Sequence, residues 1–502
     1  MRWARGGGML GAACLAWLAL APARAGDFMD VRLTWLLGDG NLLASPEEGS
    51  AGLGPSDGAR SFFDNYDTKY TGFETLGHLV LYKSVPAFFE GFGAEAALFL
   101  GIQTSEPYLR DEGSYIRMTW DWTHGLEPGT NLELTFFPVD ADRFRLGYSY
   151  KVSWGGTQAF AFREGDTQLA PGLRLQVNLP WGHAFVGLKA TRLTEDFSDG
   201  IRHWTAPEVN YAGLAGLGMD HEGFVAEVRG GYFEGGEFEG PGAEGEAHHL
   251  AGLSYQLGYH QGVPIGTSID FELYRNDPYL EERFFAPEEY DGGLSFVVKH
   301  EGSVIFQNLG DPGHFGQQVE QIGWAFDLNA ALKLGFLRVH LDVVARSLEF
   351  LLHEEPGFTP FQGIPDQASV SPEVWAAVGL DYFFEGPRLT PGLTLGVKKP
   401  ATYAIADLDV GGVTLRGHRV VVIYGPDERE ILPADQDEGL VWTVKTSLRW
   451  DYAEILALVA ELYYSRDPNR VRYLTDFNGL NLYSTFLDED VLGLNLMAQA
   501  RF

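Results

Sequence analysis

The sequence predicts an all-β protein, a transmembrane antiparallel β-barrel whose wall has roughly 18 to 22 strands, with about 22 slightly favoured. Three observations support this fold class. Apolar and polar residues alternate along many segments, the connections between these segments are alternately short and long, and both ends of the chain carry a distinct pattern. After residue 25, no stretch reaches the ~20 consecutive apolar residues that a membrane-spanning helix needs.

The alternating segments are about ten residues long, the length of a tilted membrane-spanning strand. In residues 173–179, four apolar side chains alternate with Arg174, Gln176 and Asn178. Successive side chains of a strand point to opposite faces, so such a segment has one apolar and one polar surface. Comparable segments include 115–122, 143–154, 337–346 and 442–450.

Residues 143–154 show this pattern clearly. Phe144, Leu146 and Val152 belong to the apolar set, and Arg143, Arg145 and Lys151 to the opposite set. We therefore expect 143–154 to be a strand of the barrel wall, with its apolar face toward lipid.

The connections have two lengths. Short ones are found at 180–182, 335–336 and 451–453. The long ones are rich in acidic residues and comprise 38–69, 233–247, 276–290, 309–319, 351–371, 400–437 and 466–489. Short periplasmic turns and long extracellular loops are typical of outer-membrane barrels. The strand count depends on two ambiguous places: a possible strand within 155–171, around 159–163, and residues 415–424, which suit either a loop hairpin or the wall.

The N-terminus has the pattern of a secretory signal peptide. Residues 1–5 are basic, residues 9–21 are almost wholly apolar, and Ala23-Arg-Ala25 fits a cleavage site. We expect residues 1–25 to be cleaved and residues 26–502 to form a single barrel domain. The alternative is a lipoprotein signal with Cys14 as the lipidated residue. Cleavage after Ala25 would remove the one cysteine of the chain.

The C-terminus alternates up to its last residue. The apolar positions include Leu494, Leu496, Ala498, Ala500 and Phe502. This ending resembles the closing strand of Gram-negative outer-membrane β-barrels, in which a terminal aromatic residue is an assembly signal. The resemblance implies localisation in the outer membrane, with the barrel assembly machinery, membrane lipid and lipopolysaccharide as partners.

Aromatic residues recur at the ends of the apolar faces, as expected for two belts at the lipid headgroups. They are Trp120, Trp122, Trp154, Tyr259, Trp324, Tyr382, Trp442, Trp450, Tyr464 and Phe502.

The formal net charge is −33, yet the expected inward positions carry more bases than acids. The candidate basic lining comprises Arg117, Arg143, Arg145, Lys151, Arg174, Lys189, Arg229, Arg338, Arg346, Lys445 and Arg449. One interpretation is that these bases pair with acids on neighbouring strands and stabilise the wall. The other is a basic lining that lowers the barrier for anions, which resembles the interior of acidic-polysaccharide exporters and anion-selective porins.

Two functions follow as hypotheses. The first is a polar, partly basic-lined conduit for solutes or an anionic polymer. The alternative is a non-transport barrel that anchors an envelope-spanning machine for secretion, polysaccharide export, adhesion or motility, with periplasmic partners. Arg338, His340 and Asp342 share one face of a strand, where we expect a polar cluster of the lumen. We predict no enzyme activity, cofactor, metal site or nucleic-acid partner.

Overall fold

The computed structural model describes most of the chain after residue 29. The described residues are 30–44, 52–53, 61–63, 78–85, 89–103, 108–111, 113–123, 128–141, 144–147, 152–153, 170–198, 203–237, 246–263, 290, 292–311, 313–314, 316–353, 363–366, 368–404, 408–410, 413–415, 418–424, 428–433, 435–453, 456–475 and 482–501. Within them, no helix is both long and apolar enough to cross a membrane.

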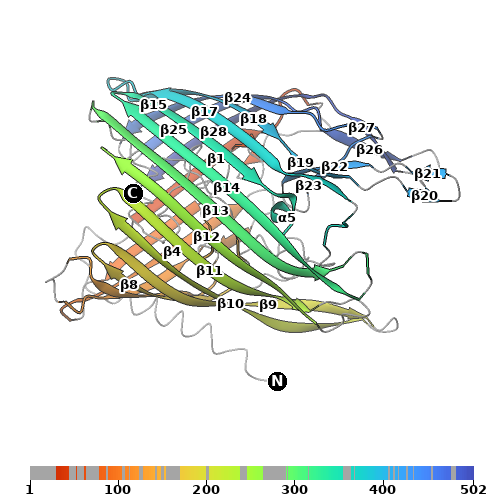
Figure 1. The fold of residues 1–502 in the computed structure, drawn as a ribbon. Helices are drawn as coiled ribbons and strands as arrows, with labels where there is room; N and C mark the ends of the chain where they lie inside the picture. Colours follow the sequence, from red (N-terminus) through yellow and green to blue (C-terminus); the bar gives the residue numbers. More distant parts are fainter. Residues whose placement is uncertain are drawn as a thin grey trace.

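One antiparallel sheet of 20 strands dominates the described part of the chain (Figure 1). Its strands are β1 (Asp30–Asp39), β2 (Gly52–Leu53), β3 (His78–Val85), β4 (Phe92–Gln103), β5 (Tyr108–Asp111), β6 (Tyr115–Trp120), β7 (Asn131–Phe137), β8 (Gly172–Leu179), β9 (Gly182–Ser198), β10 (His203–His221), β11 (Phe224–Glu237), β12 (Ala247–Gln261), β13 (Leu294–Gly310), β14 (Gln318–Leu334), β15 (Leu337–Arg346), β17 (Glu373–Tyr382), β18 (Leu389–Lys399), β24 (Val441–Ala453), β25 (Leu456–Arg466) and β28 (Asp490–Arg501).

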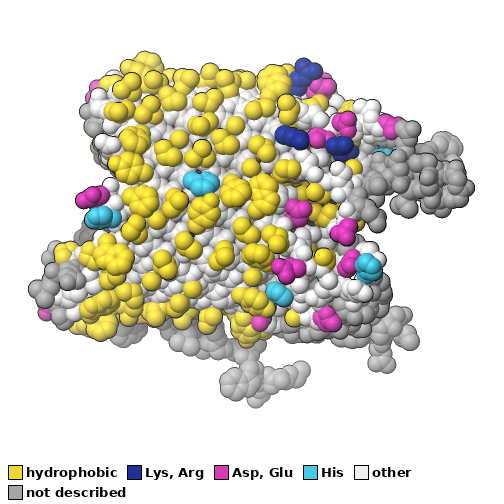
Figure 2. Space-filling model, in the orientation of Figure 1, with side chains coloured by type: hydrophobic (Ala, Val, Ile, Leu, Met, Phe, Trp, Pro, Cys, Tyr) yellow, Lys and Arg dark blue, Asp and Glu magenta, His cyan; other side chains and the backbone are white. Residues whose placement is uncertain are grey.

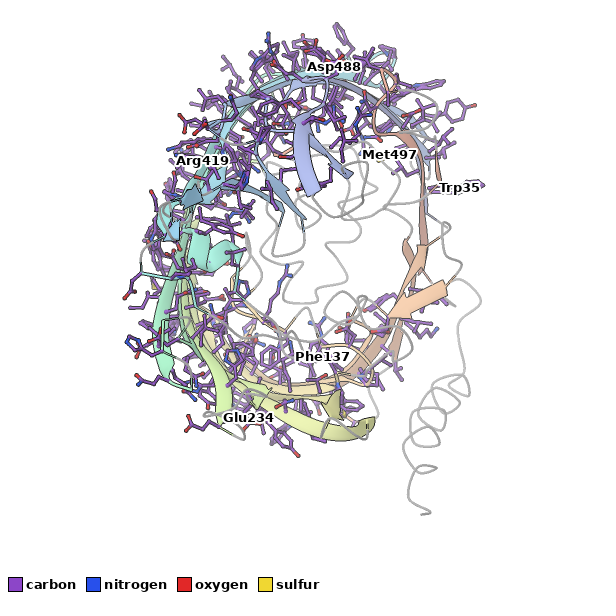
Figure 3. The ribbon with its side chains drawn as sticks, turned by 90° about the vertical axis from the view of Figure 1, so that its right-hand side faces the viewer. Trp35, Phe137, Glu234, Arg419, Asp488 and Met497 are labelled. Carbon is purple, nitrogen blue, oxygen red and sulfur yellow. The ribbon has the colours of Figure 1, made fainter. Side chains whose placement is uncertain are left out.

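The sheet closes on itself. Strands that follow one another along the chain pair in turn, and the last strand, β28, pairs with β1, which also pairs with β3. The closing register places Trp35 opposite Ala498 and Leu33 opposite Leu79. Figure 3 views the resulting ring, with Trp35 on its outside and Phe137 within. Ring closure removes free sheet edges, which is the condition for a sheet to span lipid.

Apolar side chains cover the outside of the ring. Leu188 is 67% exposed, whereas the adjacent Lys189, which points inward, is 1% exposed. Apolar side chains cover the visible outer wall, and most charged side chains on this face gather at one end (Figure 2). An outer surface of this composition is unfavourable in water and favourable in lipid. The fold therefore defines a membrane-embedded β-barrel.

The predicted alternation is confirmed along several strands. In β8, Leu173 and Leu175 are exposed outside while Arg174 is buried inside. Strands β15 and β24 follow the same rule over the predicted segments 337–346 and 442–450, and strand β6 covers residues 115–120 of the predicted segment 115–122. In β28, Leu496 is exposed on the outer face, and Asn495 and Met497 are buried on the inner face. The assembly role of this segment stays a prediction, and Phe502 lies outside the described residues.

Each end of the barrel has its own kind of connection. The short-turn end, as we call it, carries the links 180–181, 222–223 and 335–336. The start of β1 and the end of β28 also lie there, since Arg32 pairs with Arg501. Glu222 and Gly223 both have positive φ angles, of 50° and 82°, as in the primed turns that join twisted strands. The opposite end, the long-loop end, carries the connections after β1, β7, β11, β15, β18 and β25.

Aromatic side chains mark both ends. Exposed rings near the short-turn end are Trp120, Phe224, Tyr259, Tyr382 and Trp450. Toward the long-loop end, Trp442 packs against Tyr464, with ring centroids 5.3 Å apart. The predicted belt residues Trp154 and Phe502 lie outside the described residues.

The predicted long loop at 276–290 falls outside the described residues except for Tyr290. Its flanking strands β12 and β13 pair directly, Gln261 with Phe296. Both ends of the connection 262–293 therefore lie at the short-turn end, which differs from the long-loop end expected for it. The ring of Tyr290 stacks there on Phe383 at 5.1 Å.

A second, smaller sheet lies beyond the wall at the long-loop end (Figure 1). It consists of β16 (Ser369–Ser371), β19 (Ala401–Ala404), β22 (Arg419–Tyr424) and β23 (Glu428–Ile431). The helix α5 (Leu348–Leu351) packs against it through Ala401 and Val422. Two hairpins complete this end, β20–β21 (Leu408–Val410, Val413–Leu415) and β26–β27 (Val471–Thr475, Leu482–Phe486). Of the ambiguous residues 415–424, Arg419–Tyr424 thus belongs to this smaller sheet, and the wall pairing of β18 with β24 is uninterrupted.

Candidate functional site

The interior of the barrel is the candidate site, because inward positions of the wall carry ionisable side chains. Nine of the eleven predicted lining bases are described, and all nine lie in the interior. Arg143 and Lys151 fall outside the described residues. Most of the inward carboxylates that pair with the bases come from neighbouring strands and are distant in sequence, whereas Glu227 and Asp451 lie two residues from Arg229 and Arg449 on the same strands.

The first group of interior charges spans β4, β6, β7 and β8. Arg117 Nε lies 2.7 Å from Glu95 Oε1, and Arg117 Nη1 lies 3.5 Å from Glu133 Oε2. Arg174 Nη2 donates to Glu133 Oε1 at 2.6 Å, and the Thr135 hydroxyl donates to the same oxygen at 3.0 Å. Each carboxylate is therefore shared between strands, which links four strands through charge-assisted hydrogen bonds.

The second group joins β9 and β11. His183 Nε2 and Glu227 Oε2 are 2.9 Å apart, and Glu227 also binds Arg229 Nε. The Arg229 guanidinium lies 5.3 Å from the centre of the Phe185 ring. The side chains of His183, Glu227 and Arg229 are all buried, so Glu227 offsets the charge of Arg229 where little solvent reaches it.

Further pairs continue around the ring. Glu373 Oε1 accepts from Arg346 Nε at 2.9 Å, and Glu373 Oε2 forms an ion pair with Lys398 Nζ at 2.8 Å. The other described pairs are Arg338–Asp381 at 2.8 Å, Arg449–Asp451 at 2.9 Å and Lys445–Glu461 at 3.5 Å. These distances support the interpretation in which wall bases pair with wall acids.

Solvent reaches this lining at both ends of the barrel. The side chains of Arg338 and Arg449, near the short-turn end, are 18% and 28% exposed. That of Arg346, near the long-loop end, is 25% exposed. Hydrated, charged groups thus face inward at either mouth.

The prediction that 143–154 is a wall strand is wrong. Strand β7 pairs directly with β8, which leaves no place for another strand between them. Leu146 and Val152, both 0% exposed, pair with each other as an isolated antiparallel bridge inside the barrel. Their side chains join Phe144 in an apolar cluster with inward residues of β9 to β15, including Phe185. The apolar face of this segment therefore contacts an apolar part of the inner wall and not lipid.

A second segment, Ser61–Phe63, also lies against the inner wall. Phe62 contacts Trp375 with ring centroids 5.9 Å apart, and Lys445 Nζ lies 5.4 Å from the centre of the Phe63 ring. A Cβ atom on Gly396 would come within 2.7 Å of Phe63, so the absence of a side chain at Gly396 makes room for the ring. The sequence analysis missed this contact, since Phe62-Phe63 stands in a segment without alternation.

The predicted polar cluster of Arg338, His340 and Asp342 lines the interior. His340 Nδ1 lies 3.7 Å from Asp342 Oδ2, and Asp342 also accepts from Asn329. Within the described residues, no group of three or more His, Cys, Asp and Glu side chains could hold a metal ion.

Comparisons with known proteins give structural neighbours and no family. No protein-family model matches the chain, and neither does any curated protein. Solved structures similar to it include Pseudomonas aeruginosa OpdL, at 11% identity over 94% of this chain and 97% of that one, with a TM-score of 0.44. The Pseudomonas aeruginosa outer membrane protein opdK is 10% identical over 94% and 98% of the two chains, with a TM-score of 0.43. OccK2 (OpdF) of the same organism, solved in complex with glucuronate, is 8% identical over 94% and 97%, with a TM-score of 0.44.

One of these neighbours, opdK, is described as an outer membrane protein. TM-scores of this size do not establish a shared fold. The assignment of a membrane β-barrel therefore depends on the closed strand pairing and the apolar outer face of this chain.

Proposed function

We propose that this chain is an outer-membrane β-barrel that conducts small solutes through its polar interior. The observation that carries the proposal is the contrast between the two faces of the wall, apolar outside and lined inside by ionised, strand-bridging side chains. A barrel with a merely structural role could fill its core with apolar side chains. The partly exposed bases at both mouths are consistent with an aqueous path.

The proposal includes the finer architecture. Of the 20 strands of the sheet, β2 pairs with the same edge of β1 as β3, and β5 with the same edge of β4 as β6. We therefore propose a wall of about 18 strands, at the lower end of the predicted range. The short-turn end would face the periplasm, and the acidic long-loop end the exterior.

The expected selectivity is weak. A lining in which each described ion pair offsets a base with an acid creates less positive potential than unpaired bases would. Small solutes of either charge should pass, and we do not include the anionic polymer in the proposal. The structural anchor stays a prediction, and pull-down of periplasmic or inner-membrane partners from intact envelopes would support it.

Planar-bilayer recording tests the conduit. The purified, folded protein should give discrete conductance steps with a small preference between K⁺ and Cl⁻. A variant in which short Gly-Ser linkers replace the hairpins β20–β21 and β26–β27 should conduct at least as well as the intact protein. If neither form conducts, although heat-modifiable gel mobility shows that both are folded, the proposal is wrong.

A further inference from the structure

Two of the predicted lining bases contact residues inside the barrel, namely Ala141, Phe144–Gly147 and Val152–Ser153, which we call the inner segment. Lys189 Nζ donates to Ser153 Oγ at 2.8 Å, and Arg229 Nη1 donates to the backbone carbonyl of Arg145 at 3.1 Å. Both bases are almost completely buried. Their charged ends therefore point at the inner segment and are covered by it.

The wall beneath the inner segment is shaped to receive it. Four inward glycines on β8, β9, β11 and β12 leave space that its side chains fill. A Cβ atom would come within 2.7 Å of Ala141 at Gly172, 2.4 Å of Phe144 at Gly187, 3.3 Å of Leu146 at Gly231 and 2.9 Å of Leu146 at Gly252. Contacts this short exclude a larger residue unless the segment moves. The glycines thus form a groove complementary to the inner segment.

We infer that Lys189 and Arg229 are positioning residues, which hold the inner segment in this glycine groove, and that the seated segment limits the width of the channel. The inference rests on the proposed function for its second half. It replaces the role that the sequence predicts for these two bases, direct contact with anions in the lumen. The reason is geometric. The buried ammonium group of Lys189 donates to Ser153 of the chain itself, whereas a base that lines the channel would have to face the passing solute.

The sharpest test changes the Lys189–Ser153 contact from each side. It distinguishes a latch, in which Lys189 holds the inner segment against the wall, from a lining, in which Lys189 contacts anions in the channel. Ser153→Ala removes the acceptor without changing any charge, and Lys189→Met removes the donor with its charge. A latch predicts that each variant raises single-channel conductance by about twofold, with the double variant no higher than either single one. A lining predicts that Ser153→Ala leaves conductance unchanged while Lys189→Met reduces the preference for Cl⁻. The second pattern would overturn the inference.

Two glycine substitutions, one in the groove and one on the outer face of β10, form a matched pair. Gly252→Ala introduces a methyl group 2.9 Å from Leu146 Cδ1 and 3.2 Å from Val152 Cγ1, and should raise conductance by displacing the segment. Gly213→Ala is the control, since its new methyl group would meet only Leu188 Cδ2 at 3.8 Å. Equal conductance of these two variants would count against the groove.

Thiol labelling tests the latch without depending on conduction. Leu146→Cys places a thiol at a fully buried position of the inner segment, and the chain has one native cysteine, Cys14, within the expected signal peptide. Maleimide should label this thiol slowly in the folded protein, and at least about tenfold faster when Ser153→Ala is added. Unchanged labelling would refute the latch. Faster labelling in a protein that gives no conductance would retain the latch and refute the channel.

Discussion

Glu133 provides a quantitative test of how the interior is stabilised. Its carboxylate lies 2.6 Å from Arg174 and 3.5 Å from Arg117, and it accepts from Thr135 at 3.0 Å. Glu133→Gln keeps the shape and removes the charge. Breaking a buried ion pair by removal of one partner costs ~3–5 kcal/mol. Arg117 retains Glu95 at 2.7 Å, so the loss falls mainly on Arg174 and the expected cost is about 3 kcal/mol.

The assay is reversible urea unfolding of the protein folded into detergent micelles or phospholipid vesicles, followed by tryptophan fluorescence. The double variant Glu133→Gln with Arg174→Met should recover at least half of the lost stability, because it removes the charge that the single variant leaves without this carboxylate. A single-variant loss below ~1 kcal/mol would refute the reasoning. A double variant less stable than Glu133→Gln alone would refute it as well.

Two further predictions concern the outer face and the long-loop end. Leu188→Arg puts a charge on the lipid-facing side of β9 and should cost about 2–4 kcal/mol in the same unfolding assay, so an effect near zero would contradict the assigned face. At the long-loop end, burial raises the pKa of Glu430 more than the hydrogen bond from Tyr473 lowers it. The folded state therefore favours the neutral carboxyl, and its contribution is present below the ordinary pKa of glutamic acid and lost as pH rises through the raised value. Protease cleavage within 466–489 should accelerate over that window, and Glu430→Gln should abolish the pH dependence.

The predicted alternation identified which face of a wall strand meets lipid. Leu173 and Leu175 point outward and Arg174 inward because a strand presents alternate side chains to opposite sides, whatever its neighbours are. This local rule was sufficient for β8, β15, β24 and β28. It was insufficient for 143–154, where the same alternation occurs in a segment inside the barrel.

Most partners of the interior charges lie on other strands and could not be predicted, because such pairing depends on the register between strands. Arg174 meets Glu133 across 41 positions of sequence, and Arg338 meets Asp381 across 43. A shift of one residue in either strand would turn the partner to the other face. The sequence predicted more bases than acids at inward positions. The register between strands then places acids beside many of these bases.

The sequence by itself determined that the strands of this chain have one apolar and one polar face, since period-two patterning is a property of each strand alone. The tertiary structure decided what the apolar face of the inner segment would contact. Leu146 fills space above Gly252, a residue more than 100 positions away that leaves the inner wall hollow at that point. Burial in a complementary protein groove stabilises an apolar side chain as much as burial in lipid does. The shape of the inner wall therefore decided that this segment lies inside the barrel.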